Sequence, residues 1–183
     1  MIESAQLLEV IRLGNPLLRE VAEPVPEDWF SSSRLFELGR DLVRTMIEEE
    51  GVGLAAPQVA EGLRLFAYWV PATDEDAEIP PTLLVNPEIR PIGAEEEEGW
   101  EGCLSIPGLR GSVPRFRRIK VKARSLAGEP VSLTADGFHA RVIQHEYDHL
   151  AGVVFLDRMT STRSLAFEPE WERFVHAAET EGG

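Results

Sequence analysis

QHEYDHLAG, residues 144 to 152, places two histidines four positions apart, with a glutamate directly after the first. If this stretch is helical, each residue turns the backbone by about 100°, so His145 and His149 lie one turn apart on one face. Their imidazoles can then hold one metal ion, while Glu146 can reach a water on that ion from a neighbouring face. The pattern predicts a hydrolytic metal site. The alternative is a polar helix face whose histidines are satisfied by hydrogen bonds.

Two histidines are too few for a catalytic metal, which normally takes three protein ligands and leaves a position open. Downstream, Asp157 lies at a poor distance, whereas His139 and His176 are expected to be structural or exposed. The single cysteine, Cys103, lies in the Gly-containing segment EGCLS (101–105). A thiolate with two imidazoles is a familiar ligand set for an open site. A lone cysteine by itself is more often a small buried apolar side chain.

Length and composition set broad limits. With 183 residues, of which 43% are hydrophobic and 27% charged, the chain is expected to form one globular domain. The net charge of -14 argues against DNA as a partner. No apolar run approaches the roughly 20 residues of a membrane span, and the N-terminus resembles neither a secretory signal nor a transit peptide. One cysteine allows no intramolecular disulfide and fits a reducing compartment, so a cytoplasmic location is expected.

Apolar spacing predicts three helices: 35–47, 137–150 with Gly152 at its C-terminal cap, and an amphipathic segment at about 169–179 opened by Pro169. Alternating or apolar runs predict five short strands: 63–70, 83–85, 119–124, 131–135 and 153–156. Polar or Pro-containing stretches predict surface loops: 71–81, 86–93 and 95–98. The Gly- and Pro-rich stretch 99–115 is expected to be loop or bulged edge. Because helices and strands do not alternate regularly, the expected class is α+β with mainly antiparallel sheet.

Three segments resemble, in order and spacing, the signature motifs of the peptide deformylases: GVGLAAPQ (51–58), EGCLS (101–105) and QHEYDH (144–149). The likeness extends through NPLLREVAEPV (15–25) and SIPGLRGSVPR (105–115), so it spans nearly the whole chain. The resemblance implies the family's α+β fold, in which mainly antiparallel sheets surround the central helix that carries the HExxH motif. It also implies a single catalytic domain over residues 1–183.

The resemblance implies a metal-dependent hydrolase that removes the N-formyl group from the N-terminal methionine of newly made polypeptides and releases formate. In this family the ion is natively Fe2+, and Zn2+, Ni2+ or Co2+ can replace it. By the same resemblance three residues hold it: Cys103, His145 and His149. The resemblance further implies that a metal-activated hydroxide attacks the formyl carbon, and that Glu146 serves as general base and then as general acid. The Gln58 side-chain amide and the Leu104 backbone N–H are expected to stabilise the charge on the formyl oxygen.

Substrate-binding residues follow from the same resemblance. Val52 and Gly53 are expected to hydrogen-bond an extended peptide as an added strand, although a plain turn is the alternative. Phe138 and Val142 lie on roughly the face of His145; core packing is the ordinary interpretation, and in this fold they would line the methionine pocket.

Two supporting contacts near this pocket are also hypothesised. Arg110 is counted with the substrate-binding residues and is expected to form an ion pair with Glu50 behind the loop. Glu101 is expected to orient a ligating histidine.

The C-terminal segment bears on partners. Some bacterial members of the family end in a basic helix that docks on the ribosome. Here acidic residues predominate over Arg173: Glu168, Glu170, Glu172, Glu179 and Glu181. The expected partners are N-formylmethionyl nascent peptides, with ribosome proximity but no basic docking tail, no DNA and no membrane.

Two other functions are alternatives. The first is a zinc metallopeptidase that uses the same helix; the missing downstream ligand and the EGCLS segment count against it. The second is an inactive relative with a structural metal. Glu146 and Gln58 count against this second reading, because a structural site has no use for a base.

Overall fold

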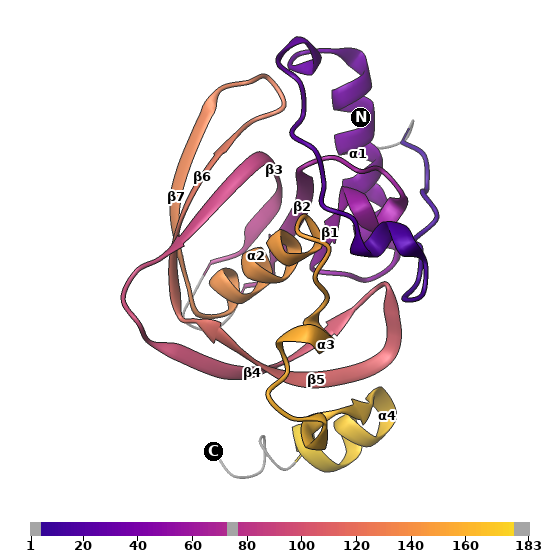
Figure 1. The fold of residues 1–183 in the computed structure, drawn as a ribbon, viewed down its shortest axis with the longest axis vertical. Coiled ribbons are helices and arrows are strands. Elements are labelled where there is room, and N and C mark those ends of the chain that lie inside the picture. Colours follow the sequence, from indigo (N-terminus) through magenta and orange to yellow (C-terminus); the bar gives the residue numbers. More distant parts are fainter. Residues whose placement is uncertain (1–4, 73–76, 178–183) are drawn as a thin grey trace.

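The structure, a computed structural model, describes residues 5–72 and 77–177, which form two antiparallel sheets around one helix (Figure 1). The first sheet has five strands in the order β1-β2-β3-β6-β7: Gly53–Ala55, Leu65–Val70, Ile79–Pro91, Arg118–Arg124 and Pro130–Asp136. The second has three strands in the order β4-β5-β8: Glu96–Cys103, Ile106–Phe116 and Ala166–Phe167. The α+β class with antiparallel sheets is confirmed.

The α-helices are α1 (Ser33–Glu48), α2 (Gly137–His149), α3 (Phe155–Arg158) and α4 (Glu168–Trp171). Short turns of other helical types complete the described chain: η1 (Pro16–Arg19), η2 (Glu27–Trp29), η3 (Ala56–Val59), η4 (Thr162–Ser164) and η5 (Glu172–His176). No helix among the described residues is long and apolar enough to cross a membrane.

The helix α1 forms where the apolar spacing predicts it. It begins after Ser32, whose side chain accepts a hydrogen bond from the Leu35 N–H at 3.3 Å and so satisfies one donor of the first turn. Leu35, Leu42 and Met46 recur on one face, are fully buried, and pack with apolar residues of β1 and β2. This burial attaches α1 to the end of the sheet that carries β1.

The helix α2 lies between the two sheets and is buried along most of its length (Figure 1). Ala140 and Ile143 pack with Phe66, Leu84 and Val121 of the five-stranded sheet. Arg141 faces the other sheet, where its side chain donates to the Val113 carbonyl of β5 at 2.7 Å. A helix enclosed in this way can carry polar residues only where each finds a partner.

The strand β3 is much longer than the predicted strand 83–85, so the loop predicted at 86–93 is wrong over 86–91, and only 92–93 lie outside the strand. A bulge between Val85 and Glu88 contains Asn86 at a φ of 48°, whose side chain bonds the backbone N–H and C=O of Val25 at 2.8 and 3.0 Å. Pro87 lies within this bulge, where no ladder N–H is needed. Pairing with β6 then resumes. Within the predicted loop 71–81, β3 begins at Ile79, and residues 73–76 lie outside the described part.

The loop predicted at 95–98 is also mostly strand. The strand β4 begins at Glu96, and the side chains of Glu96, Glu97 and Glu98 are exposed while their backbones pair with β5. The segment 99–115 is predicted to be either loop or bulged edge. It forms a β4–β5 hairpin with a bulge between Glu101 and Cys103, so the bulged edge is confirmed.

The strand predicted at 153–156 is wrong. Val154 and Phe155 are buried with Ile106 and Val113, which explains their apolar character. Their backbone is different: the Val154 N–H donates to the Asp157 carboxylate at 2.9 Å and opens the helix α3. An apolar run of this length cannot distinguish a strand from a buried helical turn.

The predicted C-terminal helix begins one residue early, at Glu168 in α4, and continues through η5 to His176. Trp171 packs against Trp100 of β4, with ring centroids 6.0 Å apart, whereas Phe174 is exposed. Residues 178 and 179 of this prediction lie outside the described part.

The residue Gly152 joins α2 to the N-terminal segment and offers a test of the fold. Its φ is +70°, and a Cβ there would lie 2.5 Å from the carbonyl oxygen of Arg19. Both the left-handed backbone and this contact oppose a side chain. We expect Gly152→Ala to lower the free energy of unfolding, measured with denaturant, by roughly 2 kcal/mol or more.

The matched control is Gly62→Ala, where nothing lies within 4 Å of the added Cβ. Its effect should stay within about 0.5 kcal/mol. Equal losses in the two variants would contradict the packing described for Gly152.

Candidate metal centre

The tip of the β4–β5 hairpin meets one face of α2 and brings three donor residues together. The Cys103 sulfur and the ring nitrogens of His145 and His149 offer atoms that all lie within 4.8 Å of one another. The Cys103 Sγ is 3.3 Å from the His149 Nε2. Both histidines are buried and the cysteine is half-buried.

These donors fit a metal ion. The Nδ1 of His145 is hydrogen-bonded to the Glu101 carboxylate at 2.9 Å, which leaves its Nε2 for the centre. The buried Nδ1 of His149 has no hydrogen-bond partner among the described residues. A cysteine sulfur and two imidazoles are a three-ligand set that would hold a divalent ion able to act as a Lewis acid.

The carboxyl of Glu146 lies beside this centre. It is buried, and its Oε2 has no hydrogen-bond partner within the described ranges. A Cβ on Gly53 would lie 2.2 Å from the Glu146 Oε1, so only glycine at this position lets the carboxyl rest against β1. Burial raises the pKa of Glu146 to about 7, against the opposing charge of His145. A carboxyl with such a pKa can both take up and release a proton near neutral pH.

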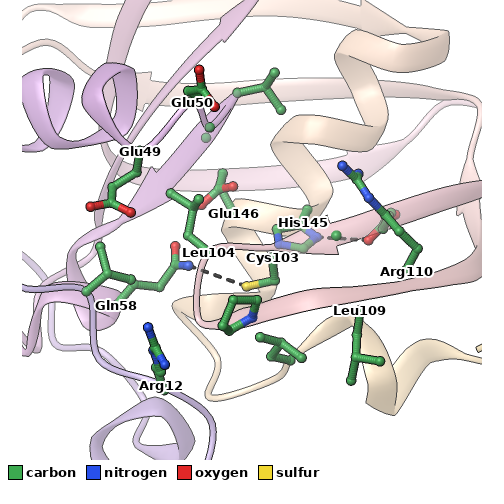
Figure 2. Close-up of a pocket in the computed structure, with 18 of the residues that line it drawn as sticks. Arg12, Glu49, Glu50, Gln58, Cys103, Leu104, Leu109, Arg110, His145 and Glu146 are labelled. Atoms are coloured by element: carbon green, nitrogen blue, oxygen red, sulfur yellow. Dashed lines mark hydrogen bonds and ion pairs between the residues drawn. The ribbon is translucent and has the colours of Figure 1, made fainter. Parts of the chain in front are cut away.

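The side chain of Gln58 is held in one orientation by its neighbours. Its Oε1 accepts from the Ala55 N–H at 2.8 Å, and its Nε2 donates to the Ser105 hydroxyl at 3.2 Å and faces the Cys103 Sγ at 3.5 Å. Figure 2 shows the amide pointing toward the sulfur. Leu104 lies in the turn of the hairpin directly after the cysteine. The amide N–H groups of Gln58 are therefore directed at the edge of the centre.

The carboxylate of Glu101 organises the polar interior behind His145. Arg115 donates to its two oxygens at 2.9 and 3.0 Å, and Arg141 donates to it at 2.9 Å. Burial would raise the pKa of Glu101, but the hydrogen bonds and charges of Arg115 and His145 outweigh this and hold it well below its ordinary value. Glu101 is thus ionised and fixes the orientation of the His145 ring, as hypothesised.

Sequence reasoning missed the rest of this cluster. Arg115 also donates to Asp148 at 2.5 Å, and Asp148 in turn binds Arg158 at 2.7 Å. The available signal is helical spacing: Arg141 and Asp148 flank His145 by one turn, so a helix that buries the histidine turns both of them inward as well.

A cavity of about 1060 Å³ opens beside the centre, between β1, β5 and α2. The hypothesised substrate residues all line it: Val52, Gly53, Phe138, Val142 and Arg110. β1 is an edge strand, and the Val52 carbonyl already accepts from the Trp69 N–H at 2.9 Å. The ion pair expected between Glu50 and Arg110 is wrong, because Arg110 binds Glu168 instead, at 2.5 Å.

The remaining candidate ligands lie elsewhere. His139 contacts the Tyr68 hydroxyl at 3.2 Å and stacks on its ring, so its role is structural, as expected. Asp157 forms an ion pair with Arg19. His176 stacks on Trp171, with ring centroids 5.0 Å apart.

An α+β fold that brings a cysteine sulfur and two imidazoles together beside a buried carboxyl is that of a metallohydrolase. The polypeptide deformylase family model matches residues 7–164. Peptide deformylase 2 of Pseudomonas putida is 46% identical over 154 residues, which cover 82% of this chain and 86% of that protein. Peptide deformylase 1 of Prochlorococcus marinus is 46% identical over 168 residues, covering 90% of this chain and 86% of the relative.

Solved structures agree. The actinonin-bound class I type b peptide deformylase of Acinetobacter baumannii has a TM-score of 0.78 and 38% identity, covering 85% of this chain and 100% of its own. The peptide deformylase of Thermotoga maritima has a TM-score of 0.77 and 38% identity, covering 85% of this chain and 99% of its own. The chain belongs to the peptide deformylase family, metal-dependent hydrolases that remove the N-formyl group from nascent peptides.

The buried ion cluster offers a stability test. Arg115 is 6% exposed and is shared by two buried carboxylates, so replacing it with methionine leaves Glu101 to Arg141 and Asp148 to the half-exposed Arg158. We expect Arg115→Met to lower the free energy of unfolding by about 3–5 kcal/mol, because removing a partner from buried charges is costly. Denaturant unfolding of the metal-free protein measures this.

Arg117→Met is the matched control, since Arg117 pairs with Glu95 and Asp136 on the surface and is 53% exposed. It should change stability by less than about 1 kcal/mol. If the two variants were equally stable, the cluster would not have the structural role given to it here.

Proposed function

We propose that this chain is a working deformylase whose single divalent ion is held by Cys103, His145 and His149. The observation that carries the proposal is the convergence of these three donors beside the buried carboxyl of Glu146. The reaction breaks the C–N bond of the formamide, joins a water oxygen to the formyl carbon, and yields formate and a free N-terminal amine.

We assign Fe2+ as the ion, on the resemblance to the family, with Zn2+, Ni2+ or Co2+ as substitutes. A mixed thiolate and imidazole set accepts all of these ions. The chemistry that a divalent ion supplies in such a site is Lewis acidity, which makes water nucleophilic near neutral pH. The protein contributes the geometry: Glu101 holds the His145 ring, and the hairpin holds the thiol.

Glu146 is assigned the proton transfers. Its carboxyl takes the proton of the attacking water and passes it to the departing amine, which could not leave as an anion. The pKa of about 7 suits both steps, and the close contact with Gly53 keeps the carboxyl at the cavity wall.

Gln58 and Leu104 are assigned to the formyl oxygen, on which negative charge grows during attack. The Gln58 amide is held in place by Ala55 and Ser105, and the N–H that faces the Cys103 sulfur at 3.5 Å is the one assigned to the formyl oxygen. The backbone N–H of Leu104 supplies a second donor at the hairpin turn. Fixed donors of this kind are each worth about 3 kcal/mol in the transition state.

The peptide is assigned to the edge of β1, where Val52 and Gly53 can pair with an extended chain. Phe138 and Val142 are assigned to the methionine side chain, since both line the cavity on the α2 side. One Acinetobacter baumannii deformylase structure holds Met-Ala-Ser, a peptide of the kind this site would release.

Nascent peptides carrying N-formylmethionine are the proposed substrates, and the cytoplasm the proposed location. Proximity to the ribosome would not depend on a basic tail, because α4 and η5 carry Glu168, Glu170 and Glu172 against Arg173. The further acidic residues of the tail, Glu179 and Glu181, lie outside the described residues. A high negative charge also opposes any partnership with DNA.

The general base is tested by Glu146→Gln, which removes the proton acceptor and keeps the size of the side chain. We expect kcat for a formyl-Met-Ala-Ser peptide to fall at least 100-fold, because general-base catalysis contributes about 10²–10⁴-fold. The metal content, measured by elemental analysis, should stay at the parental value. Formate release is the readout.

The exposed Glu88→Gln on β3 is the control and should retain parental turnover. Parental activity in Glu146→Gln would overturn the assigned role. Cleavage of unformylated Met-Ala-Ser by the parent protein would favour a peptidase instead.

The ligand set and the ion are tested together by anaerobic purification. We expect about one ion per chain in the parent and a loss of most bound metal in Cys103→Ala, because the thiolate is one of three ligands. The iron-loaded protein should lose activity in air faster than the nickel-loaded protein, since ferrous iron and thiolate both oxidise. Full metal content in Cys103→Ala would contradict the assignment of the thiolate.

A further inference from the structure

The segment after residue 164 lies beyond the part of the chain that matches the family model, yet it forms part of the active-site wall. The strand β8 pairs with β5 through Leu109↔Phe167 and Arg110↔Ala166. Glu168, the next residue, opens α4 and lines the same cavity as His145 and Glu146. Glu168 therefore lies in the cavity beside the candidate metal centre, although it falls outside the residues that match the family model.

The contact that Glu168 makes is an ion pair with Arg110. Its Oε1 accepts from the Arg110 Nε at 2.9 Å and from Nη2 at 2.5 Å. The two side chains are 37% and 34% exposed, so the pair stands at the mouth of the cavity and not in the core. Trp171 covers the pair, with its ring centroid 5.2 Å from the guanidinium.

The guanidinium of Arg110 lies close to the centre itself. A Cβ on Gly102 would be 3.0 Å from the Arg110 Nη1, and Gly102 directly precedes Cys103. In Figure 2 Arg110 lies on the side of the cavity opposite to Gln58 and Glu49. The cation thus stands on the wall that a peptide bound along β1 faces across the cavity.

The other cations of the cavity are placed differently. Arg141 is buried, and its guanidinium donates hydrogen bonds to Glu101 and to backbone carbonyls. It therefore presents little charge to the opening of the cavity. Arg12 belongs to the N-terminal segment, and the rim carries the acids Glu9, Glu49 and Glu50. Without Glu168, Arg110 would present a full positive charge to the substrate on the β5 wall.

We propose that Glu168 is a specificity-determining residue: by neutralising Arg110, it sets how the enzyme discriminates between acidic and basic side chains at the second and third residues of the substrate. An unpaired guanidinium in a partly desolvated cavity attracts a substrate carboxylate and repels an ammonium group. With Glu168 in place this bias is cancelled. The inference rests on the proposed function, because it concerns the substrate of that same site.

The test compares five substrates: formyl-Met-Ala-Ser and four versions that carry Glu or Lys at the second or the third residue. The measured quantity is the ratio of kcat/KM for the Glu peptide to that for the Lys peptide. In Glu168→Gln this ratio should rise about fivefold at low salt, the size expected of two partly exposed charge interactions. The rise should shrink as salt screens the charges.

Three variants complete the experiment. Arg110→Gln uncovers the Glu168 carboxylate, so the ratio should fall below the parental value. In the double variant Arg110→Gln/Glu168→Gln neither charge remains, and the ratio should return to within about twofold of the parent, as a coupled pair requires. Glu170→Gln, an exposed glutamate of the same helix that does not line the cavity, should leave the ratio unchanged.

A purely structural role for Glu168 predicts a different result. Loosening of the C-terminal segment would lower turnover of acidic and basic peptides alike and leave their ratio at the parental value, and this result at both positions would overturn the proposal. If Glu168→Gln fails to fold, the test rests on Arg110→Gln. A ratio of kcat/KM for the Glu and Lys peptides that is unchanged in Arg110→Gln would also overturn the proposal. Failure of the parent to release formate from formyl-Met-Ala-Ser would instead count against the proposed function itself.

Discussion

The buried carboxylate of Glu101 is the interaction on which the rest of this structure depends. It belongs to β4, and it accepts hydrogen bonds from Arg115 of β5 and from Arg141 and His145 of α2. Burying one such charge costs several kcal/mol, and only a full set of partners offsets that cost. Because the partners come from β5 and from α2, all of them reach the carboxylate only when these elements lie together around the end of β4. That arrangement holds the hairpin against the helix.

The position of the candidate metal centre follows from this arrangement. Cys103 lies two residues after Glu101, at the end of the strand, and His145 is itself one of the carboxylate's partners. The same contacts that satisfy the buried charge therefore bring the sulfur within reach of both imidazoles. Close packing adds the last requirement, since Gly53 leaves just enough room for Glu146 at the edge of the centre. Stability and chemistry share the same few residues.

The outer wall of the cavity, where Glu168 binds Arg110, is held by an exposed ion pair and not by buried charges. The core of the site lies within residues 7–164, the range that matches the family model, while Glu168 and Trp171 come from beyond it. An exposed ion pair contributes little to stability, so this wall can differ between relatives without unfolding the protein. A surface addition that touches the mouth of a cavity can therefore alter selectivity and leave the reaction intact.

Local pattern in the chain was sufficient for some of these features. The 3.6-residue period of apolar residues predicted α1 and α2, and the alternation at 119–124 and 131–135 predicted β6 and β7. The HExxH spacing placed two donors on one helix face. These features could be predicted because each depends only on residues that are close in sequence. The tertiary structure alone decided the strand β3, the helical turn at Phe155, and the partners of Arg110 and Arg115. These features depend on residues that are distant in sequence. Pairing with β6 keeps the segment around Pro87 in a strand, and the carboxylates that bind Arg110 and Arg115 belong to Glu168 and Asp148. Contacts between residues far apart in the sequence leave no periodic pattern in it, so they are seen only in the folded structure.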